Sequence, residues 1–135
     1  MKYSLTTKHI KFCSPDYNHI TLEELNDIES ISELYLGDVL WKVPNPVKFL
    51  TNDVVPKLTN GATIHVESFD IYELASSVLY GSVKTNKLSK ILYESDYVRV
   101  LSREDVIGIA EKSGFLTVKQ DIDNIKYLLT FIKLD

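Results

Sequence analysis

Residues 115–134 of the chain read FLTVKQDIDNIKYLLTFIKL, and this stretch decides the fold. Its two halves are rich in branched aliphatic and aromatic residues, which predicts strands at Phe115–Gln120 and Ile125–Leu134. Only Asp121–Asn124 joins the two halves. Because a crossover between parallel strands needs about a dozen residues or more, these two strands must form an antiparallel hairpin.

Upstream of the hairpin, segments with strand patterns alternate with segments that have helical patterns. Residues Met1–Leu5 alternate between apolar and polar, and strands are predicted at His9–Cys13, Ile31–Gly37 and Ala62–Glu67. Helices are predicted from Thr21 to about Ile28, from Asn45 to about Leu58, and after Asp70, Asn86 and Ser102. Strands that alternate with helices indicate a mainly parallel sheet with crossover helices. The prediction is an α/β fold with flanking helices and a C-terminal antiparallel hairpin.

Residues with special backbone preferences mark the ends of the predicted helices. Asn45 suits an N-cap position, and Pro46 suits the first helical position because its missing N–H would be unpaired there. Pro56, later in the same segment, predicts either a kink or the start of a second turn. Residues Thr59–Gly61 predict the end of this helix, and Asp70 predicts the N-cap of the next one.

The composition is that of one globular domain. The chain has 135 residues, of which 44% are hydrophobic and 25% are charged, so we expect a single domain over residues 1–135. A net charge of −4 disfavours nucleic acid as a partner, because such a surface does not attract phosphates. No apolar run approaches the roughly 20 residues of a membrane span. The single cysteine, Cys13, fits a reducing cytoplasm, so we expect a cytoplasmic protein without a membrane partner.

Three segments match sequence patterns that occur together in one enzyme family. They are Ser32–Leu40 (SELYLGDVL) with Val43–Pro46 (VPNP), Leu58–Val66 (LTNGATIHV), and Ser102–Asp105 (SRED) with Ala110–Phe115 (AEKSGF). In this order, and followed by the hairpin, they resemble the C-terminal half of class I S-adenosylmethionine-dependent methyltransferases, in the small-molecule and sugar-type branch. The resemblance covers Ile31–Asp135 and implies a shortened, Rossmann-like methyltransferase sheet.

The resemblance also implies where a cofactor would bind, and there the chain departs from the family. Class I enzymes hold S-adenosylmethionine with a glycine-rich loop after the first strand, because the backbone must approach the ligand closely. This chain has no glycine before Gly37, and Asp16 is the one early candidate for the acidic residue that holds the ribose. We therefore expect a truncated methyltransferase-like protein that lacks the N-terminal cofactor-loop unit, takes no cofactor and is not catalytic alone.

Two functions remain open at this point. In the first, the chain is a binding or oligomerising module, and a homo-oligomer or another protein covers the shortened sheet, since exposed sheet edges and apolar patches are normally covered. In the second, the chain is an active methyltransferase that binds S-adenosylmethionine in a remodelled site and methylates a small molecule or a sugar. The small size and the Lys-, Ile- and Asn-rich sequence suggest a viral or phage-like protein.

The candidate binding residues lie where predicted parallel strands end, because open α/β sheets bind ligands at that edge. Gly37 and Asp38 are the candidates for cofactor binding. Glu67, Asp70 and Tyr72 are the candidates for substrate binding. The alternatives are that Asp38 caps the segment that follows it and that Asp70 caps a helix.

Aromatic residues near these positions have two interpretations each. Trp41 could stack on a ligand ring, although a lone tryptophan is more often an anchor in a core or interface. Four tyrosines lie in the helical insert that in the resembled family shapes the substrate pocket or covers the sheet: Tyr72, Tyr80, Tyr93 and Tyr97. Amphipathic tyrosines in such a place can also face a partner surface.

The other reactive side chains predict neither a metal site nor a catalytic residue. His9 and His19 have no metal-ligand spacing with Cys13, and Cys13 itself predicts a buried, inert thiol. His65 alternates with apolar neighbours, and the sequence assigns it no Ser, Cys or acidic partner. We therefore expect a sheet histidine that a helix covers.

Overall fold

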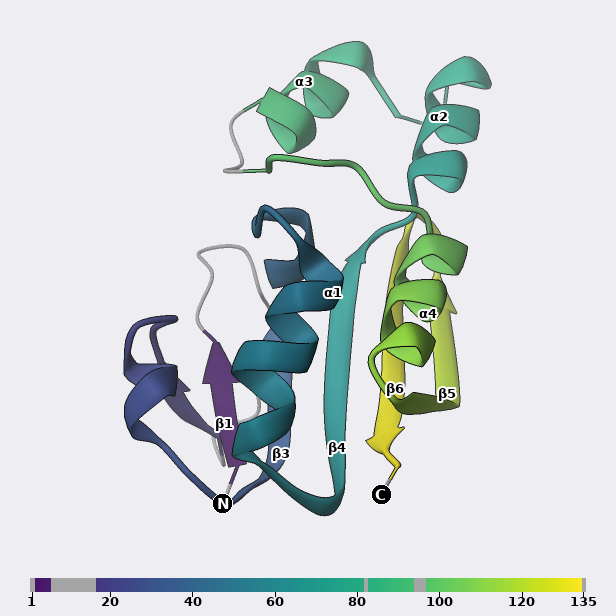
Figure 1. The fold of residues 1–135 in the computed structure, drawn as a ribbon. Coiled ribbons are helices and arrows are strands. Elements are labelled where there is room, and N and C mark those ends of the chain that lie inside the picture. The colour runs from purple at the N-terminus through teal and green to yellow at the C-terminus, as the bar shows by residue number, and fades with distance from the viewer. Residues whose placement is uncertain (1, 6–16, 82, 94–96, 135) are drawn as a thin grey trace.

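The computed structural model describes residues 2–5, 17–81, 83–93 and 97–134 (Figure 1). Its strands are β1 (Lys2–Leu5), β2 (Asn18–Ile20), β3 (Ile31–Gly37), β4 (Leu58–Phe69), β5 (Phe115–Asp123) and β6 (Lys126–Lys133). Its α-helices are α1 (Pro46–Lys48), α2 (Ile71–Leu79), α3 (Thr85–Tyr93) and α4 (Arg103–Lys112). Short 3-10 and π-helical segments are η1 (Glu24–Asp27), η2 (Val39–Trp41), η3 (Phe49–Val54) and η4 (Val55–Lys57). The predicted strand His9–Cys13, its thiol and Asp16 lie outside the described residues.

The described strands form one six-stranded sheet in the order β2–β1–β3–β4–β6–β5 (Figure 1). Strand β1 is parallel to β2 and to β3, and β3 is parallel to β4. Strand β6 is antiparallel to both β4 and β5. The predicted α/β fold, with a mainly parallel sheet and a C-terminal antiparallel hairpin, is therefore confirmed.

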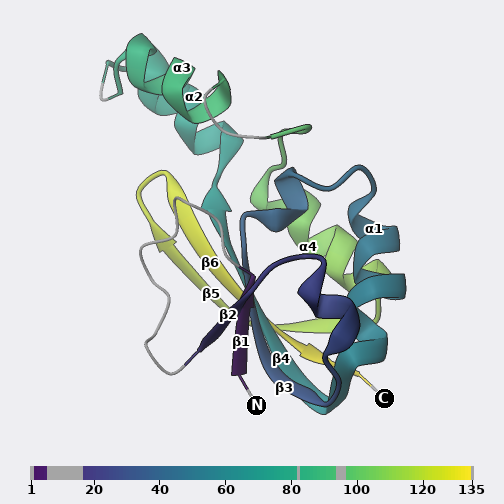
Figure 2. The same cartoon turned by 90° about the vertical axis from the view of Figure 1, so that its left-hand side faces the viewer.

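Alternation of side chains along the strands gives the sheet one apolar face. Leu34 and Leu36 of β3 and Ile64 and Val66 of β4 are all 0% exposed on this face. They share one core cluster with Val106 of α4. Figure 2 shows α1 and α4 together on this side of the sheet. Burial of these aliphatic side chains supplies the main driving force for folding.

The opposite side of the strands, called here the second face, carries polar side chains. It includes Glu33, Tyr35, His65, Glu67 and Thr130, because the positions along each strand alternate with the buried ones. The strand registers pair Tyr35 with His65 and His65 with Thr130. Polar side chains from three adjacent strands therefore lie next to one another.

The connection from β3 to β4 is helical, but it is not one regular α-helix. Its N-cap is Asn45, as predicted, with Oδ1 accepting a 3.1 Å hydrogen bond from the backbone N of Lys48. The α-helical turn passes into the π-helical η3 and then into the 3-10 turn η4, which contains Pro56. The predicted helix end at residues 59–61 is wrong, because β4 already begins at Leu58. Gly61 of β4 has a left-handed φ of +71°. It lies in the stretch of β4 where the pairing with β3 is irregular.

The hairpin turn is tighter than the sequence predicted. Strand β5 continues to Asp123 and β6 begins at Lys126, so residues 121–123 belong to the ladder and not to a loop. Asn124 turns the chain with a φ of +58°, a conformation that asparagine tolerates better than most residues. Extending the ladder gives more backbone groups a hydrogen-bond partner.

Two further elements differ from prediction. The sequence pattern missed β2, which has only three residues and lies at the edge of the sheet. The short helix predicted from Thr21 is a single 3-10 turn, η1, although the Thr21 hydroxyl accepts a 3.2 Å bond from the backbone N of Glu24 as expected. Helices α2 and α3 lie beyond the carboxyl ends of β3 and β4 and form a second small core with Ile125 (Figure 1).

Candidate functional site

Gly37 and Asp38 lie at the carboxyl end of β3, where the sequence predicted cofactor contacts. Gly37 has a φ of +58°, which glycine adopts without strain. Asp38 is 4% exposed, and its side chain makes no capping bond to η2. The hydroxyl of Tyr97 donates a 2.7 Å hydrogen bond to Asp38 Oδ2, and the Nζ of Lys42 lies 3.9 Å from Oδ1. Oδ2 therefore has a hydrogen-bond donor from the protein itself, whereas the buried Oδ1 has the charge of Lys42 nearby and no hydrogen-bond partner among the described atoms.

A segment called here the strap, residues 97–101, lies over this end of β3. The ring of Tyr97 packs against the indole of Trp41, with ring centroids 4.9 Å apart. The backbone N of Val98 donates to the carbonyl of Trp41 at 2.9 Å, and Arg99 Nε donates to the carbonyl of Val43 at 3.2 Å. Figure 1 shows the strap as a green segment that passes between α3 and the sheet. Trp41 is 0% exposed, so it acts as a core anchor that holds the strap.

Glu67 lies near the carboxyl end of β4 and is 9% exposed. The hydroxyl of Tyr35 donates a hydrogen bond to its Oε2. Burial raises the pKa of Glu67, and the charge of Asp38 acts in the same direction, against the Tyr35 hydrogen bond and the charge of Lys126. A pocket of about 190 Å³ opens beside this carboxyl group and is also lined by Asp121, Asp123, Lys126, Tyr127 and Leu128. The environment of Glu67 therefore favours its protonated form more than water does.

Asp70 and Tyr72, the other two predicted substrate contacts, lie at the start of α2. Asp70 is the N-cap of this helix, because its Oδ1 accepts a 3.0 Å bond from the backbone N of Tyr72. The side chains of Tyr72 and Tyr80 are largely in solvent, since these residues are 70% and 81% exposed. The side chain of Tyr93 lies outside the described part of the chain. Substrate binding by Glu67, Asp70 and Tyr72 stays a prediction.

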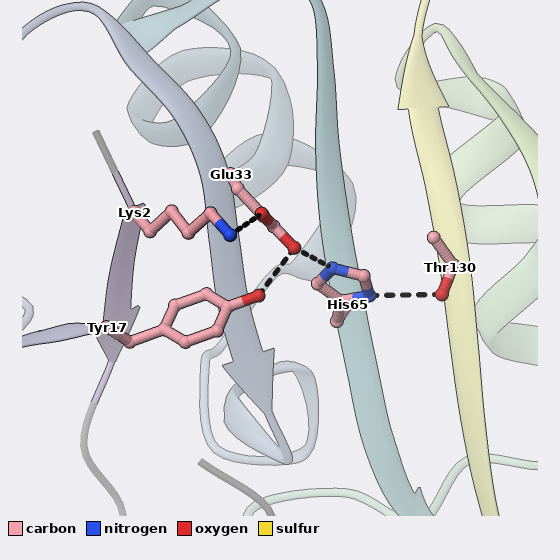
Figure 3. A network of polar contacts seen from close by, with 5 residues as sticks. All are labelled: Lys2, Tyr17, Glu33, His65 and Thr130. Atoms are coloured by element: carbon pink, nitrogen blue, oxygen red, sulfur yellow. Dashed lines mark hydrogen bonds and ion pairs between the residues drawn. The ribbon is translucent and has the colours of Figure 1, made fainter. Parts of the chain in front are cut away.

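Sequence reasoning missed a polar network on the second face (Figure 3). His65 Nε2 lies 2.8 Å from Glu33 Oε1, and His65 Nδ1 lies 3.0 Å from Thr130 Oγ1. The Tyr17 hydroxyl donates to the same Glu33 oxygen at 2.5 Å, and the Nζ of Lys2 lies 3.4 Å from the other one. The expectation that His65 has no acidic partner is wrong. The described helices α1 and α4 pack against the apolar face, so they do not cover His65 as expected (Figure 2).

The charge state of Glu33 sets the hydrogen-bond roles in this network. Partial burial raises the pKa of Glu33, but the hydrogen bonds from Tyr17 and His65 and the charges of His65 and Lys2 outweigh it, so the pKa lies below its usual value. An ionised Glu33 only accepts hydrogen bonds, so His65 Nε2 carries the proton. In a neutral ring Nδ1 is then the acceptor for the Thr130 hydroxyl.

The order Thr130–His65–Glu33 matches that of a nucleophile, a base and an orienting acid. Acyl transfer also needs donors for the developing oxyanion. Thr130 lies within β6, which has ladder partners on both sides, so the peptide N–H groups around it belong to the sheet. The network therefore fits a polar binding or stabilising role better than nucleophilic catalysis.

Comparison with known proteins finds similarity in structure but not in sequence. At the level of sequence, no protein-family model and no curated protein matches this chain. Among solved structures, a methyltransferase from Thermotoga maritima described as a possible histamine N-methyltransferase superposes with a TM-score of 0.58 at 17% identity. A methyltransferase from Methanosarcina mazei superposes with a TM-score of 0.60 at 12% identity. Magnesium protoporphyrin IX methyltransferase from Synechocystis PCC 6803, solved with bound SAH, gives 0.53 at 12%.

The chain has the class I methyltransferase fold. The three superpositions cover 87%, 96% and 87% of this methyltransferase-like chain. They cover 63%, 73% and 51% of the matched proteins, so this chain spans about half to three quarters of their length. Identities of 12–17% establish the fold and carry no residue roles.

Two acidic residues at the carboxyl edge, Asp38 and Glu67, are not free to hold the ribose of S-adenosylmethionine in this arrangement. A ribose needs an acidic side chain that is free to accept from its hydroxyls. Asp38 is buried, bonded to Tyr97 and covered by the strap, and Glu67 is bonded to Tyr35. In sequence, residues 6–16, which follow β1, contain no glycine. We therefore derive no reaction step through this cofactor.

Among the residues that the structure describes, no group of three or more His, Cys, Asp or Glu side chains is placed to hold a metal ion. None of the described helices has the length and apolar character needed to cross a membrane.

Proposed function

We propose that this methyltransferase-like chain is a binding module that does not take up S-adenosylmethionine on its own. The observation that carries the proposal is the Tyr97–Asp38 bond of 2.7 Å beneath the strap. A ligand that used Asp38 Oδ2 would have to displace Tyr97 from both the carboxylate and the Trp41 ring, and Oδ1, which has no hydrogen-bond partner among the described atoms, is itself buried. The free energy needed to break these contacts would reduce its affinity.

The proposal assigns the second face to contacts with another macromolecule. This face combines titratable groups such as Glu33 and His65 with half-buried aliphatic residues such as Leu128 and Ile132. Such a mixture is typical of protein interfaces, which are about as apolar as ordinary surface and place charged groups at the rim.

Calorimetric titration of the protein with S-adenosylmethionine and with SAH tests the proposal. We expect no measurable heat at protein concentrations of tens of micromolar. A saturable signal with a micromolar Kd would contradict it. The Tyr97→Phe variant is the matched control, because it removes only the hydroxyl that occupies Asp38. Binding that appears in this variant alone would support the role of the strap.

A second candidate function is methyl transfer by a remodelled site, and the pocket beside Glu67 favours it. A buried carboxyl group with a raised pKa at the ligand edge of an α/β sheet is suited to act as a general base. This candidate requires S-adenosylmethionine to bind, so the same titration decides between the two functions. If binding is found, loss of methyl transfer in Glu67→Gln with unchanged cofactor affinity would assign the base.

A further inference from the structure

Strand β5 is an edge strand, and its outer side has no partner among the described strands. It has nine residues, whereas β2 at the other edge has three. Along such an edge, unpaired N–H and C=O groups form a template that can pair with another strand. A long exposed edge is therefore a candidate interaction surface.

The side chains on β5 make this edge unusually apolar for a solvent-exposed strand. Leu116 and Val118 are each 51% exposed, and Ile122 is 55% exposed. Between them lie Lys119 and Asp121, whose charged groups are 3.5 Å apart and 67% and 53% exposed. Residues two apart in a strand point to the same face, so this pair stands side by side on the second face.

We propose that β5 pairs antiparallel with β5 of a second copy of this chain, about a two-fold axis at Gln120. In a two-fold antiparallel pair, residues equally distant from the axis lie opposite each other. Lys119 then faces Asp121 of the second copy, and the same ion pair forms again on the other side of the axis. Val118, which lies at an irregularity of β5, comes near Ile122 of the second copy. The two six-stranded sheets become one continuous sheet.

Charge complementarity selects this register over its neighbours. An axis at Lys119 would place the two copies of Lys119 opposite each other. An axis at Asp121 would pair Lys119 with Asp123 of the second copy, but it would also place the two copies of Asp121 opposite each other. An axis at Ile122 would place Asp121 opposite Asp123. Directly opposed like charges destabilise a sheet, whereas opposite charges stabilise it. Of these registers, the one with its axis at Gln120 makes opposite-charge pairs without opposing like charges, which favours a second copy over an unrelated partner.

A β-bulge between Thr117 and Lys119 limits the strength of this pairing. Bulges increase the twist of an edge and shorten the stretch that can pair regularly. We therefore expect a dimer whose population rises with protein concentration. This inference rests on the proposed function as a binding module and names one of its partners.

Sedimentation velocity over a hundredfold concentration range tests the interface. The wild type is expected to shift from monomer to dimer. Lys119→Asp places aspartates opposite each other and is expected to weaken dimerisation at least tenfold. The double variant Lys119→Asp with Asp121→Lys restores opposite charges and is expected to dimerise like the wild type. Lys48→Asp on α1 makes the same charge change away from β5 and is expected to have no effect.

The outcomes separate this inference from the proposed function. A wild type that stays monomeric throughout, or a folded double variant that does not recover dimerisation, would overturn the β5 pairing. Circular dichroism confirms folding, and concentration-dependent slowing of amide exchange in residues 117–123 would support pairing directly. The same samples are titrated with S-adenosylmethionine. Heat from a dimeric sample would refute the proposed function alone, whereas no heat from a persistent monomer would refute the interface alone.

Discussion

The hydroxyl of Tyr97 donates a 2.7 Å hydrogen bond to the carboxylate of Asp38, which lies 59 positions earlier in the chain. This one bond joins the strap to the carboxyl end of β3, at the place where an α/β sheet normally receives its ligand. It explains how a chain can keep a methyltransferase-like sheet while its own side chains occupy the ligand edge.

Tyr97→Phe should destabilise the fold. The variant leaves Asp38 Oδ2 without its hydrogen-bond donor in a residue that is 4% exposed. Leaving a buried acceptor unpaired costs about 1–3 kcal/mol, so we expect the free energy of unfolding in urea to fall by that amount. Tyr80→Phe is the matched control, since Tyr80 is 81% exposed and should change the free energy by less than about 0.5 kcal/mol. Equal values for both variants would refute the structural role of the bond.

Tyr127→Phe should cost less stability than Tyr35→Phe. The Tyr127 hydroxyl is buried and makes no hydrogen bond of good geometry among the described atoms, although the Trp41 indole interacts with it, so removing it should change the unfolding free energy by less than about 1 kcal/mol. The Tyr35 hydroxyl donates to buried Glu67, so its removal should cost about 1–3 kcal/mol. A clear loss of stability in Tyr127→Phe would instead indicate that the Trp41 indole, a water molecule or a ligand atom forms a strong hydrogen bond with this hydroxyl.

Glu33→Gln should lose stability at neutral pH and lose less at acid pH. The pKa of Glu33 lies below its usual value of 4.5, so its stabilising contribution is complete above that value and is lost as the pH falls through the folded-state pKa. Glutamine cannot ionise, so its deficit relative to the wild type should shrink below about pH 4.5. Thermal unfolding of both proteins between pH 3 and pH 7 measures this. A deficit that does not change with pH would show that the charge of Glu33 is not what stabilises the network.

Glu67→Gln should show the reverse dependence on pH. Burial raises the pKa of Glu67 above its usual value of 4.5, so the wild type loses stability as the pH rises through the folded-state pKa. A permanently neutral glutamine avoids this loss and can still accept the hydrogen bond from Tyr35. The melting temperature of Glu67→Gln relative to the wild type should therefore increase between pH 4 and pH 7. The idea fails if the difference stays constant or decreases.

Local sequence signals predicted the parts of the fold that depend on neighbours in the chain. The pattern of residues 31–37 predicted strand β3 with its observed bounds. The N-caps Asn45 and Asp70 predicted where α1 and α2 begin. Strand β2 escaped prediction because a three-residue edge strand carries almost no periodic signal.

The polar network could not be predicted for a different reason. Glu33, His65 and Thr130 are far apart in the chain and meet only through the registers of β3 with β4 and of β4 with β6. A register is set by the whole buried face of a sheet, and shifting it by one residue moves every side chain to the other face. The candidate residues at the strand ends, such as Asp38 and Glu67, were placed from the topology of the sheet alone. Their location could therefore be predicted, but their hydrogen-bond partners Tyr97 and Tyr35 could not.

The position of β6 also sets the order in which this sheet can be assembled during synthesis. Strand β6 follows β5 in the chain, yet it lies between β4 and β5. Until β6 has left the ribosome, β5 has no neighbour in the sheet, and one side of β4 is an open edge that can pair with other nascent chains. Folding of this domain is therefore expected to finish late, in a single step that depends on residues 126–133.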